Sequence, residues 1–171
     1  QVRTEVGAKV IAVAHHRDDS VETFLLNLVR GTGINGLKGI AAINGVIVRP
    51  LLDVSREEIL EFLKNLHQDY VTDSTNLQDE YTRNKLRLNV IPMLKEINPS
   101  VCESIAETAR RLSDVEAVYR EAMKVACARV TEEEGRFSIP RIVKEVSPLA
   151  VLFELFHPYG FNAAQLKDIY R

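Results

Sequence analysis

The apolar positions of residues 9–66 predict short strands alternating with amphipathic helices. Residues 9–15, KVIAVAH, form an apolar run without polar alternation, which is typical of a buried parallel strand. From Asp19 onward the spacing of apolar residues becomes helical. The stripe on this first helix consists of Val21, Phe24, Leu25 and Leu28. Residues 46–49 predict a second short strand.

The remaining periodic segments are helical. Residues 55–67 predict a helix that begins with a capping box made by Ser55 and Glu58. Residues 81–97 predict a helix that is interrupted near Pro92, because proline cannot donate the next helical hydrogen bond. A long helix is expected over 101–133, with candidate inner positions Ile105, Ala109, Leu112, Val115, Val118 and Tyr119.

Asn98-Pro99-Ser100 breaks the helical pattern and marks a boundary. Strands alternating with helices favour an α/β sheet with parallel strands before this boundary. After it come the long helix, a short extended link over 135–140 and shorter helices. We therefore predict a helix-dominated α/β fold, with a truncated parallel-sheet domain in residues 1–98 and an all-helical subdomain in 99–171.

Composition narrows the function classes. The net charge of −2 argues against a dedicated polybasic nucleic-acid binder, and no apolar run is long enough to cross a membrane. The two cysteines, Cys102 and Cys127, are typical of a reducing, cytoplasmic compartment and exclude a cysteine zinc ribbon within this chain. The chain begins with Gln1 and has no signal-peptide pattern, so we expect a piece of a longer protein.

The sequence HHRDDSVE, residues 15–22, concentrates polar groups between the first strand and the first helix. Asp19 and Glu22 would serve as N-cap and N3 of that helix. Three residues apart on one face, they would also reach one ligand, either Mg²⁺ beside phosphates or an ammonium group. Zinc is disfavoured, because His15 and His16, adjacent on an extended strand, point to opposite sides.

The segment GTGING, residues 31–36, matches the spacing of a dinucleotide-binding fingerprint. That fingerprint follows a strand and opens a helix, whereas this segment follows a helix, so we discount the dinucleotide interpretation. Gly31 and Gly33 more simply allow a tight turn and a close approach of backbone to a ligand. Arg30 precedes them and is available to pair a phosphate or a carboxylate.

The stretch HHRDDSVETFLLNLVRGTGINGLKGI, residues 15–40, resembles the second signature of the PP-loop ATP pyrophosphatases. More narrowly, it resembles the tRNA(Ile)-lysidine synthetase family. Three further stretches support the narrower match, and their order and spacing are specific: VRPLLDVSREEI (48–59), DSTN (73–76) and YTRNKLRLNVIPML (81–94). The resemblance covers roughly residues 9–98, and residues 99–171 loosely resemble the helical substrate-binding region of that family.

The resemblance implies a two-step reaction. ATP adenylates the wobble cytidine of an isoleucine tRNA at its C2 oxygen and releases pyrophosphate. The amine of free lysine then attacks that carbon and releases AMP. ATP, Mg²⁺, free lysine and the anticodon region of tRNA(Ile) are therefore the expected ligands, and Mg²⁺ and arginines would offset the charge that develops on phosphate.

The resemblance also assigns roles. Asp19 is the first choice for the Mg²⁺-binding or lysine-binding acid, and His15 for orienting substrate or assisting proton transfer. Glu22 would grip the amine end of lysine. Substrate-binding roles are expected for Arg30, Arg83, Asn84 and Arg87, and nucleotide-binding roles for Gly31 and Gly33. The alternative for Arg83 and Arg87 is a solvated helix face paired with Asp79 or Glu80, and Asp73 and Asn76 are either turn formers or supporting residues.

The sequence departs from the family at one decisive point. The nucleotide-binding loop Ser-Gly-Gly-x-Asp-Ser is absent from these 171 residues. We expect the first strands and a C-terminal tRNA-binding domain to be missing as well. We therefore predict that the chain alone is inactive, and that dimerisation is one way to cover its missing core.

Two other functions compete with lysidine formation. One is another PP-loop tRNA-modifying enzyme of the 2-thiolation type, which would need reactive cysteines. The other is a non-catalytic helical RNA-binding module that uses Arg110 and Arg111, and it predicts salt-dependent RNA binding without a requirement for ATP or lysine. The mixed charges of helix 101–133 favour an ordinary solvated face over such a module.

Overall fold

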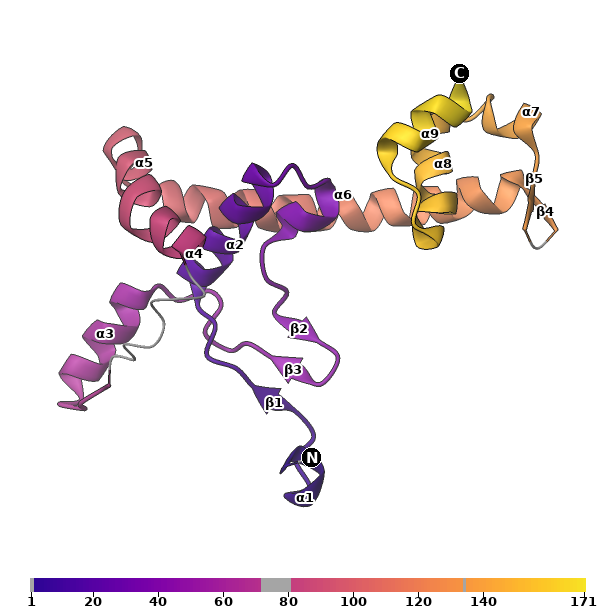
Figure 1. Cartoon of the computed structure of the whole chain (residues 1–171). Coiled ribbons are helices and arrows are strands. Elements are labelled where there is room, and N and C mark those ends of the chain that lie inside the picture. The colour runs from indigo at the N-terminus through magenta and orange to yellow at the C-terminus, as the bar shows by residue number, and fades with distance from the viewer. Residues whose placement is uncertain (1, 72–80, 134) are drawn as a thin grey trace. The chain divides into compact units, whose positions relative to one another are not determined.

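The computed structural model describes residues 2–71, 81–133 and 135–171 (Figure 1). The chain forms two compact units, Gln1–Asp114 and Val115–Arg171, and the long helix α6 (Val101–Val130) contributes residues to both. Across the described residues no helix is both long and apolar enough to cross a membrane.

Three two-residue strands form the sheet of the first unit: β1 (Ile11–Ala12), β2 (Ile43–Asn44) and β3 (Ile47–Val48). β1 pairs in parallel with β3, whereas β2 pairs antiparallel with β3, so the described sheet is mixed and not the purely parallel sheet that we predict. The β2–β3 hairpin, which the sequence analysis missed, turns at Gly45 with φ of +58°. This left-handed conformation is one that glycine adopts readily. The short helix α1 (Val2–Glu5) precedes β1.

The expectation that residues 9–15 form a buried strand is wrong in one respect. β1 is an edge strand, and both its residues are exposed. Ile11, for example, keeps 44% of its surface accessible. A run without polar alternation predicts burial only when elements cover both faces and both edges of the strand. In the described part of the chain, β1 has a neighbour on one side only.

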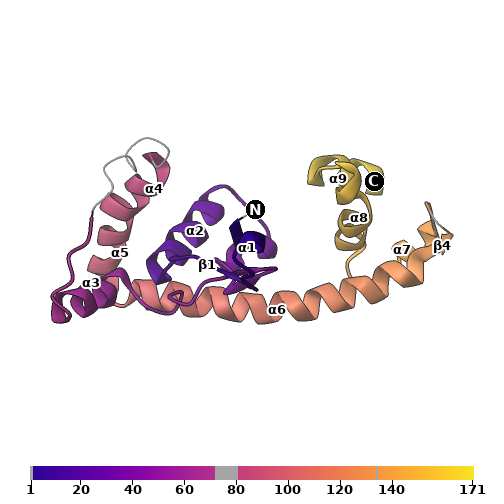
Figure 2. The same ribbon diagram turned by 90° about the horizontal axis from the view of Figure 1, so that it is seen from below.

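The core of the first unit forms where α2 (Arg17–Val29) packs on the beginning of α6 (Figures 1 and 2). Three of the four predicted stripe residues are buried, but Leu28 is exposed and Leu26 takes its place. The buried set is Val21, Phe24, Leu25, Leu26, Leu86, Ile91, Cys102 and Ala109. The wider buried face shows that α2 is covered on more than the single predicted stripe.

The helix predicted over 81–97 is interrupted, as expected from Pro92, although the interruption is a π-helical turn. α4 (Tyr81–Lys85) leads into η3 (Leu86–Val90), which leads into α5 (Ile91–Ile97). The N–H of Ile91 donates to the carbonyl oxygen of Leu86, five residues back. Proline lacks an N–H and its ring crowds the carbonyl four residues earlier, so a wider turn before it relieves that conflict.

Helix α3 (Arg56–Asn65) starts with the predicted capping box. The N–H of Glu58 donates to Ser55 Oγ, and the N–H of Ser55 donates to the Glu58 carboxylate, at 3.1 and 2.7 Å. Its apolar face is nevertheless not part of the core. None of its described residues is buried, and Phe62 is exposed. A short 3-10 helix, η1 (Ile34–Lys38), follows α2 in the chain.

The second unit is helical except for one hairpin. β4 (Thr131–Glu133) pairs antiparallel with β5 (Arg136–Phe137). The predicted long helix therefore ends at Val130, and the expectation of an all-helical subdomain needs this correction. The hairpin turns near Gly135, whose φ is +75°. The remaining elements are α7 (Ile139–Ile142), α8 (Pro148–Phe156), η4 (His157–Tyr159) and α9 (Ala163–Tyr170).

The core of the second unit uses the last turns of α6. Its buried residues are Ala126, Val130, Ile142, Val151, Leu152 and Leu166, with a cluster of Phe137, Phe156 and Phe161 packed edge-to-face beside them. Of the inner positions predicted for α6, Ala109 is buried, whereas Val115 and Val118 are exposed. Both exposed residues lie in the middle of α6, in the sequence between Ala109, which belongs to the first core, and Ala126, which belongs to the second.

Candidate functional site

The first turn of α2 carries the acids that the sequence analysis singled out, but in a different register. The helix begins at Arg17, so His16 is its N-cap and Asp19 is N3. Asp19 Oδ2 accepts a hydrogen bond from the His16 N–H at 2.9 Å. The prediction that Asp19 is the N-cap and Glu22 is N3 is therefore wrong by three residues, because the helix starts one turn earlier than the apolar stripe indicates.

The two histidines have different partners, in keeping with the expectation that they point to opposite sides. His15 Nδ1 accepts from Arg49 Nε at 3.3 Å, next to the end of β3. His16 instead lies beside the acids of α2, with ring nitrogens 3.5 Å from both Asp18 and Asp19. Of the two, His16 faces the cleft described below.

Glu22 and Arg87 form a two-point ion pair between α2 and η3. Arg87 Nε lies 2.6 Å from Glu22 Oε1, and Nη2 lies 3.0 Å from Oε2. The Glu22 side chain is 2% exposed, and that of Arg87 is 38% exposed. A planar guanidinium matches a carboxylate in this bidentate geometry, which fixes both side chains. The structure thus joins two residues that the sequence analysis had selected independently.

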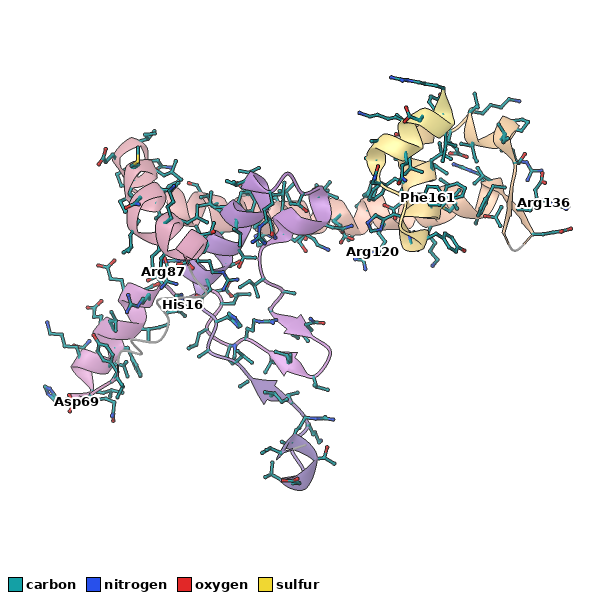
Figure 3. The ribbon with its side chains drawn as sticks, viewed as in Figure 1. His16, Asp69, Arg87, Arg120, Arg136 and Phe161 are labelled. Carbon is teal, nitrogen blue, oxygen red and sulfur yellow. The ribbon has the colours of Figure 1, made fainter. Side chains whose placement is uncertain are left out.

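A cleft of about 1140 Å³ opens between α2, α3, α5 and the first turn of α6. Figure 3 shows His16 and Arg87 close together where these elements meet, and Asp69 beyond the far end of α3. The lining includes the charged residues Arg17, Asp18, Glu22, Arg56, Arg87, Lys95 and Glu103. Acids and bases are both present, so the cleft suits a ligand that carries charges of both signs, such as a nucleotide with its metal or an amino acid.

Arg17 and Asp18 are functional candidates that the sequence analysis missed. Arg17 Nη2 lies 3.2 Å from carboxylate oxygens of both Glu58 and Glu103. Asp18 Oδ2 accepts from the backbone N–H of Arg56 at 2.7 Å. Both residues belong to the HHRDD segment. Their partners lie on other helices, far away in the sequence, so no local pattern predicts these contacts.

Other predicted site residues lie outside this cleft. Arg30 is the exposed C-cap of α2, eleven residues from Asp19, which corresponds to about 16 Å along a helix. Gly31, with φ of +74°, and Gly33, the N-cap of η1, lie at the same end. Arg83 and Asn84 are half-buried on α4 and do not line the cleft. Asp73, Asn76, Asp79 and Glu80 lie outside the described residues.

Asp19 itself does not line the cleft, so it fits Mg²⁺ only as one carboxylate ligand of an ion held mainly by phosphates. In the described ranges, no three His, Cys, Asp or Glu side chains converge on one point. Mg²⁺ characteristically uses one or two carboxylates and completes its shell with phosphate oxygens and water. Asp19 accepts one backbone hydrogen bond, and a carboxylate has about four lone-pair sites, so it keeps capacity for a metal.

Residues 1–94 match the family model described as the PP-loop domain. The chain belongs to the PP-loop domain family. A second model, described as the TilS substrate binding domain, matches residues 130–171 of the same chain. The PP-loop match contains every residue of the cleft wall from α2, α3 and η3.

This PP-loop chain is similar over nearly its whole length to proteins named tRNA(Ile)-lysidine synthase. It is 56% identical over 169 residues to the protein from Bacteroides thetaiotaomicron, which is 99% of the chain and 39% of the relative. It is 48% identical over 170 residues to that of Parabacteroides distasonis and 41% identical over 170 residues to one from Porphyromonas gingivalis, again over 99% of the chain. The chain spans 37–39% of the length of these relatives.

The two cysteines of the PP-loop chain lie in or beside the two hydrophobic cores. Cys102 is buried and Cys127 is half-buried. Burial is the main cause that raises the pKa of each thiol; Glu154 raises that of Cys127 further, whereas Lys95 partly opposes the rise at Cys102. Because the thiolate is the nucleophile, both residues suit packing rather than sulfur chemistry.

The basic pair Arg110 and Arg111 is matched by an acid on the same face of α6. Both guanidinium groups donate to Glu107, with N–O distances of 2.8–3.0 Å. These hydrogen bonds lower the pKa of Glu107 to about 2. Arg110 also lies 3.8 Å from Asp114, so two acids offset the charge of the two arginines, as expected for a solvated helix face.

Proposed function

We propose that this chain is part of an ATP-dependent ligase that joins lysine to the wobble cytidine of an isoleucine tRNA and so forms lysidine. The observation that carries the proposal is the 56% identity over 99% of the chain to a protein named tRNA(Ile)-lysidine synthase. The match of residues 130–171 to a substrate-binding domain named for the same kind of protein supports it.

In this proposal the cleft beside α2 binds the small substrates. Glu22 and Arg87 form the fixed charged pair on its wall, and a lysine molecule, with one carboxylate and two amines, complements such a pair. The exposed part of the Arg87 guanidinium would hold the lysine carboxylate, and the Glu22 carboxylate would favour a nearby ammonium. Arg83 and Asn84, one turn before Arg87, would extend this binding surface.

Asp19 would act where the phosphates bind. Attack of the cytidine C2 oxygen on the α-phosphorus of ATP forms one P–O bond and breaks the bond to pyrophosphate. Bound Mg²⁺ would supply charge neutralisation for this step. Asp19 contributes a carboxylate at the positive end of α2, which already orients it through the His16 N–H.

The second step needs a base. The attacking amine of lysine must lose a proton as its C–N bond forms and the AMP leaves. His15 is our proposed residue for orienting this step, because Arg49 donates to Nδ1 and the proton of the neutral ring then lies on Nε2, where it can donate to substrate. A carboxylate near the amine would take the proton that the amine loses. Arg30, Gly31 and Gly33, at the opposite end of α2, would contact another part of the nucleotide or the tRNA.

We further propose the cytoplasm as the location, tRNA(Ile) as the macromolecular partner, and a functional boundary after residue 98. A homodimer remains part of the proposal for the isolated chain, in which the exposed edge of β1 would be covered. The raised pKa of both thiols favours lysidine formation over a 2-thiolation reaction, because sulfur transfer needs an accessible thiolate.

A hybrid enzyme tests the proposal. In the relative from Bacteroides thetaiotaomicron, the aligned 169 residues are replaced by this chain. The purified hybrid is given radiolabelled lysine, ATP, Mg²⁺ and an unmodified tRNA(Ile) transcript. We expect lysine in the tRNA, dependent on ATP, and no incorporation when the wobble cytidine of the transcript is changed to uridine.

Two comparisons complete the experiment. The 171-residue chain alone should incorporate no lysine, because the Ser-Gly-Gly-x-Asp-Ser loop is absent from its sequence. A hybrid that folds, as judged by circular dichroism, but transfers no lysine would contradict the proposed function. Transfer of sulfur to the same tRNA would support the thiolation alternative instead.

A further inference from the structure

Helix α3 forms one wall of the cleft although the core does not hold it. None of its described residues is buried, and the exposed side chains at this helix and its C-cap include Phe62 and Leu66. A ten-residue helix is marginal in water on its own. Its position therefore depends on the contacts at its ends rather than on a packed face.

Those contacts come from two adjacent residues of α2. Over the described ranges, every hydrogen bond or ion pair between α3 and another helix involves Arg17 or Asp18. Both contacts reach the first turn of α3, at Glu58 and Arg56. The far end of α3, toward His67, has no such connection in the described chain.

Arg17 is the more widely connected of the two. A single nitrogen, Nη2, lies 3.2 Å from both Glu58 Oε2 and Glu103 Oε1. The Arg17 side chain is 20% exposed, whereas each acid is more than half exposed. One exposed ion pair contributes little, but a partly buried guanidinium shared by two acids joins α2, α3 and α6 at one point.

Asp18 satisfies a donor that α3 cannot satisfy itself. The N–H of Arg56 is one of the first N–H groups of the helix, which have no intrahelical acceptor. Asp18 Oδ2 accepts from it at 2.7 Å, with its negative charge at the positive end of the helix. Ser55 satisfies the N–H of Glu58 from within the segment, so α3 is capped both locally and from α2.

We propose that Arg17 and Asp18 are positioning residues that clasp the first turn of α3 and so set where this wall of the cleft lies. The inference concerns the same cleft as the proposed function and rests on it only for the effect on substrate binding. Loss of the clasp should free α3 while the core around α2 stays folded, because no described residue of α3 belongs to that core.

Hydrogen exchange of the 171-residue chain tests the clasp directly. The variants are Arg17→Gln and Asp18→Ala, and exchange is followed by mass spectrometry on peptides from α3, α2 and α8. We expect α3 amides to exchange about tenfold faster in each variant, a factor equal to about 1.4 kcal/mol. Peptides with the buried residues of α2, and those of the second unit, should be unchanged.

Matched variants separate the clasp from a general loss of charge. Arg56→Gln removes a neighbouring cation of the cleft, but keeps the backbone N–H that Asp18 binds, and should leave α3 exchange unchanged. Glu57→Gln should likewise have no effect, whereas Glu58→Gln should resemble Arg17→Gln. Asp18→Asn retains an acceptor oxygen and should restore most of the protection lost in Asp18→Ala.

Two results would overturn the clasp. One is α3 exchange that is unchanged in both Arg17→Gln and Asp18→Ala. The other is an equal increase across α2 and α3, since the two residues would then hold the whole unit rather than the wall. Neither result depends on enzyme activity.

The hybrid enzyme adds the effect on binding. Arg17→Gln in the hybrid should raise KM for lysine or ATP more than it lowers kcat, with Arg17→Lys intermediate. A fall in kcat at unchanged KM would contradict a positioning role. A wild-type hybrid without any lysine transfer would contradict the proposed function and leave the exchange result standing.

Discussion

Glu22 on α2 and Arg87 on η3 are 65 positions apart in the sequence and share two hydrogen bonds, of 2.6 and 3.0 Å. The carboxylate is almost fully buried while the guanidinium keeps an exposed side toward the cleft. A buried charge of this kind needs its partner, so the pair anchors η3 beside the cleft.

Arg87→Leu should destabilise the chain by about 2–3 kcal/mol, because it leaves the buried Glu22 carboxylate without its guanidinium. Urea unfolding measures the change. Arg83→Leu, one turn earlier and half-buried, is the matched control and should cost less than about 0.5 kcal/mol. Equal stability of Arg87→Leu and the wild type would mean that the ion pair does not anchor η3.

Asp19→Asn should separate capping from chemistry. The asparagine oxygen can still accept from the His16 N–H, so unfolding free energy should change by less than about 0.5 kcal/mol. Lysine transfer by the hybrid enzyme should fall by at least about 100-fold, since the amide carries no charge for Mg²⁺ or an ammonium. Unchanged transfer would contradict the role proposed for Asp19.

Both cysteines should react slowly with a thiol reagent in the native chain and quickly in urea. Burial raises both thiol pKa values above the ordinary value of 9.0, so the thiolate fraction is low. The raised pKa values contribute to the stability of the native state. This contribution is fully present below the ordinary thiol pKa of 9.0 and decreases as the pH rises above it.

An exposed thiol on the same helix supplies the control for this reaction. Ala128 is exposed and directly follows Cys127, so Ala128→Cys in a chain with both native cysteines changed to serine gives a reference rate. The native thiols should react more slowly than this introduced thiol. A native Cys127 that reacts as fast as the reference would reopen the thiolation alternative.

Tyr119 should ionise only at very high pH. Burial and the nearby Glu154 carboxylate, which accepts the phenol hydrogen bond at 3.1 Å, raise the pKa of Tyr119 to about 12. The resulting contribution to stability is complete below pH 10.0, the ordinary pKa, and is lost as the pH rises toward 12. Phenolate absorbance against pH measures this step, and Tyr119→Phe should remove it. A titration curve that Tyr119→Phe leaves unchanged would show that Tyr119 does not ionise in this pH range and would contradict the prediction.

Local sequence patterns predicted the features that depend on neighbours in the chain. The capping box of Ser55 and Glu58 and the interruption before Pro92 follow from short-range rules and are confirmed. Strands also form within 9–15 and 46–49, but their parallel pairing is a long-range contact that no local pattern predicts. The beginning of α2 was misplaced because its first turn is polar. The N-cap there is a histidine, which is not among the residues that usually mark a helix start.

The parts of the site that were missed depend on distant partners. Residues such as Glu22 and Arg87 were chosen by chemical type, but only the fold shows that they form one ion pair. The role of Arg17 was missed for the same reason, because its partners Glu58 and Glu103 lie on two other helices. For α3 and the edge strand β1, the sequence predicts burial where the structure shows exposure. Apolar periodicity indicates a face that can be buried, but it does not show whether another element covers that face.

The π-helical turn of η3 has a consequence for how this cleft tolerates sequence change. Leu86 and Ile91 are five residues apart and both reach the same core, although in an α-helix they would lie about 140° apart around the axis. Deleting one residue from this turn would restore regular winding and change the direction in which Arg87 points relative to α5. The cleft therefore depends on the number of residues between Arg87 and Pro92 as well as on their identity. Insertions and deletions there should be far more damaging than conservative substitutions.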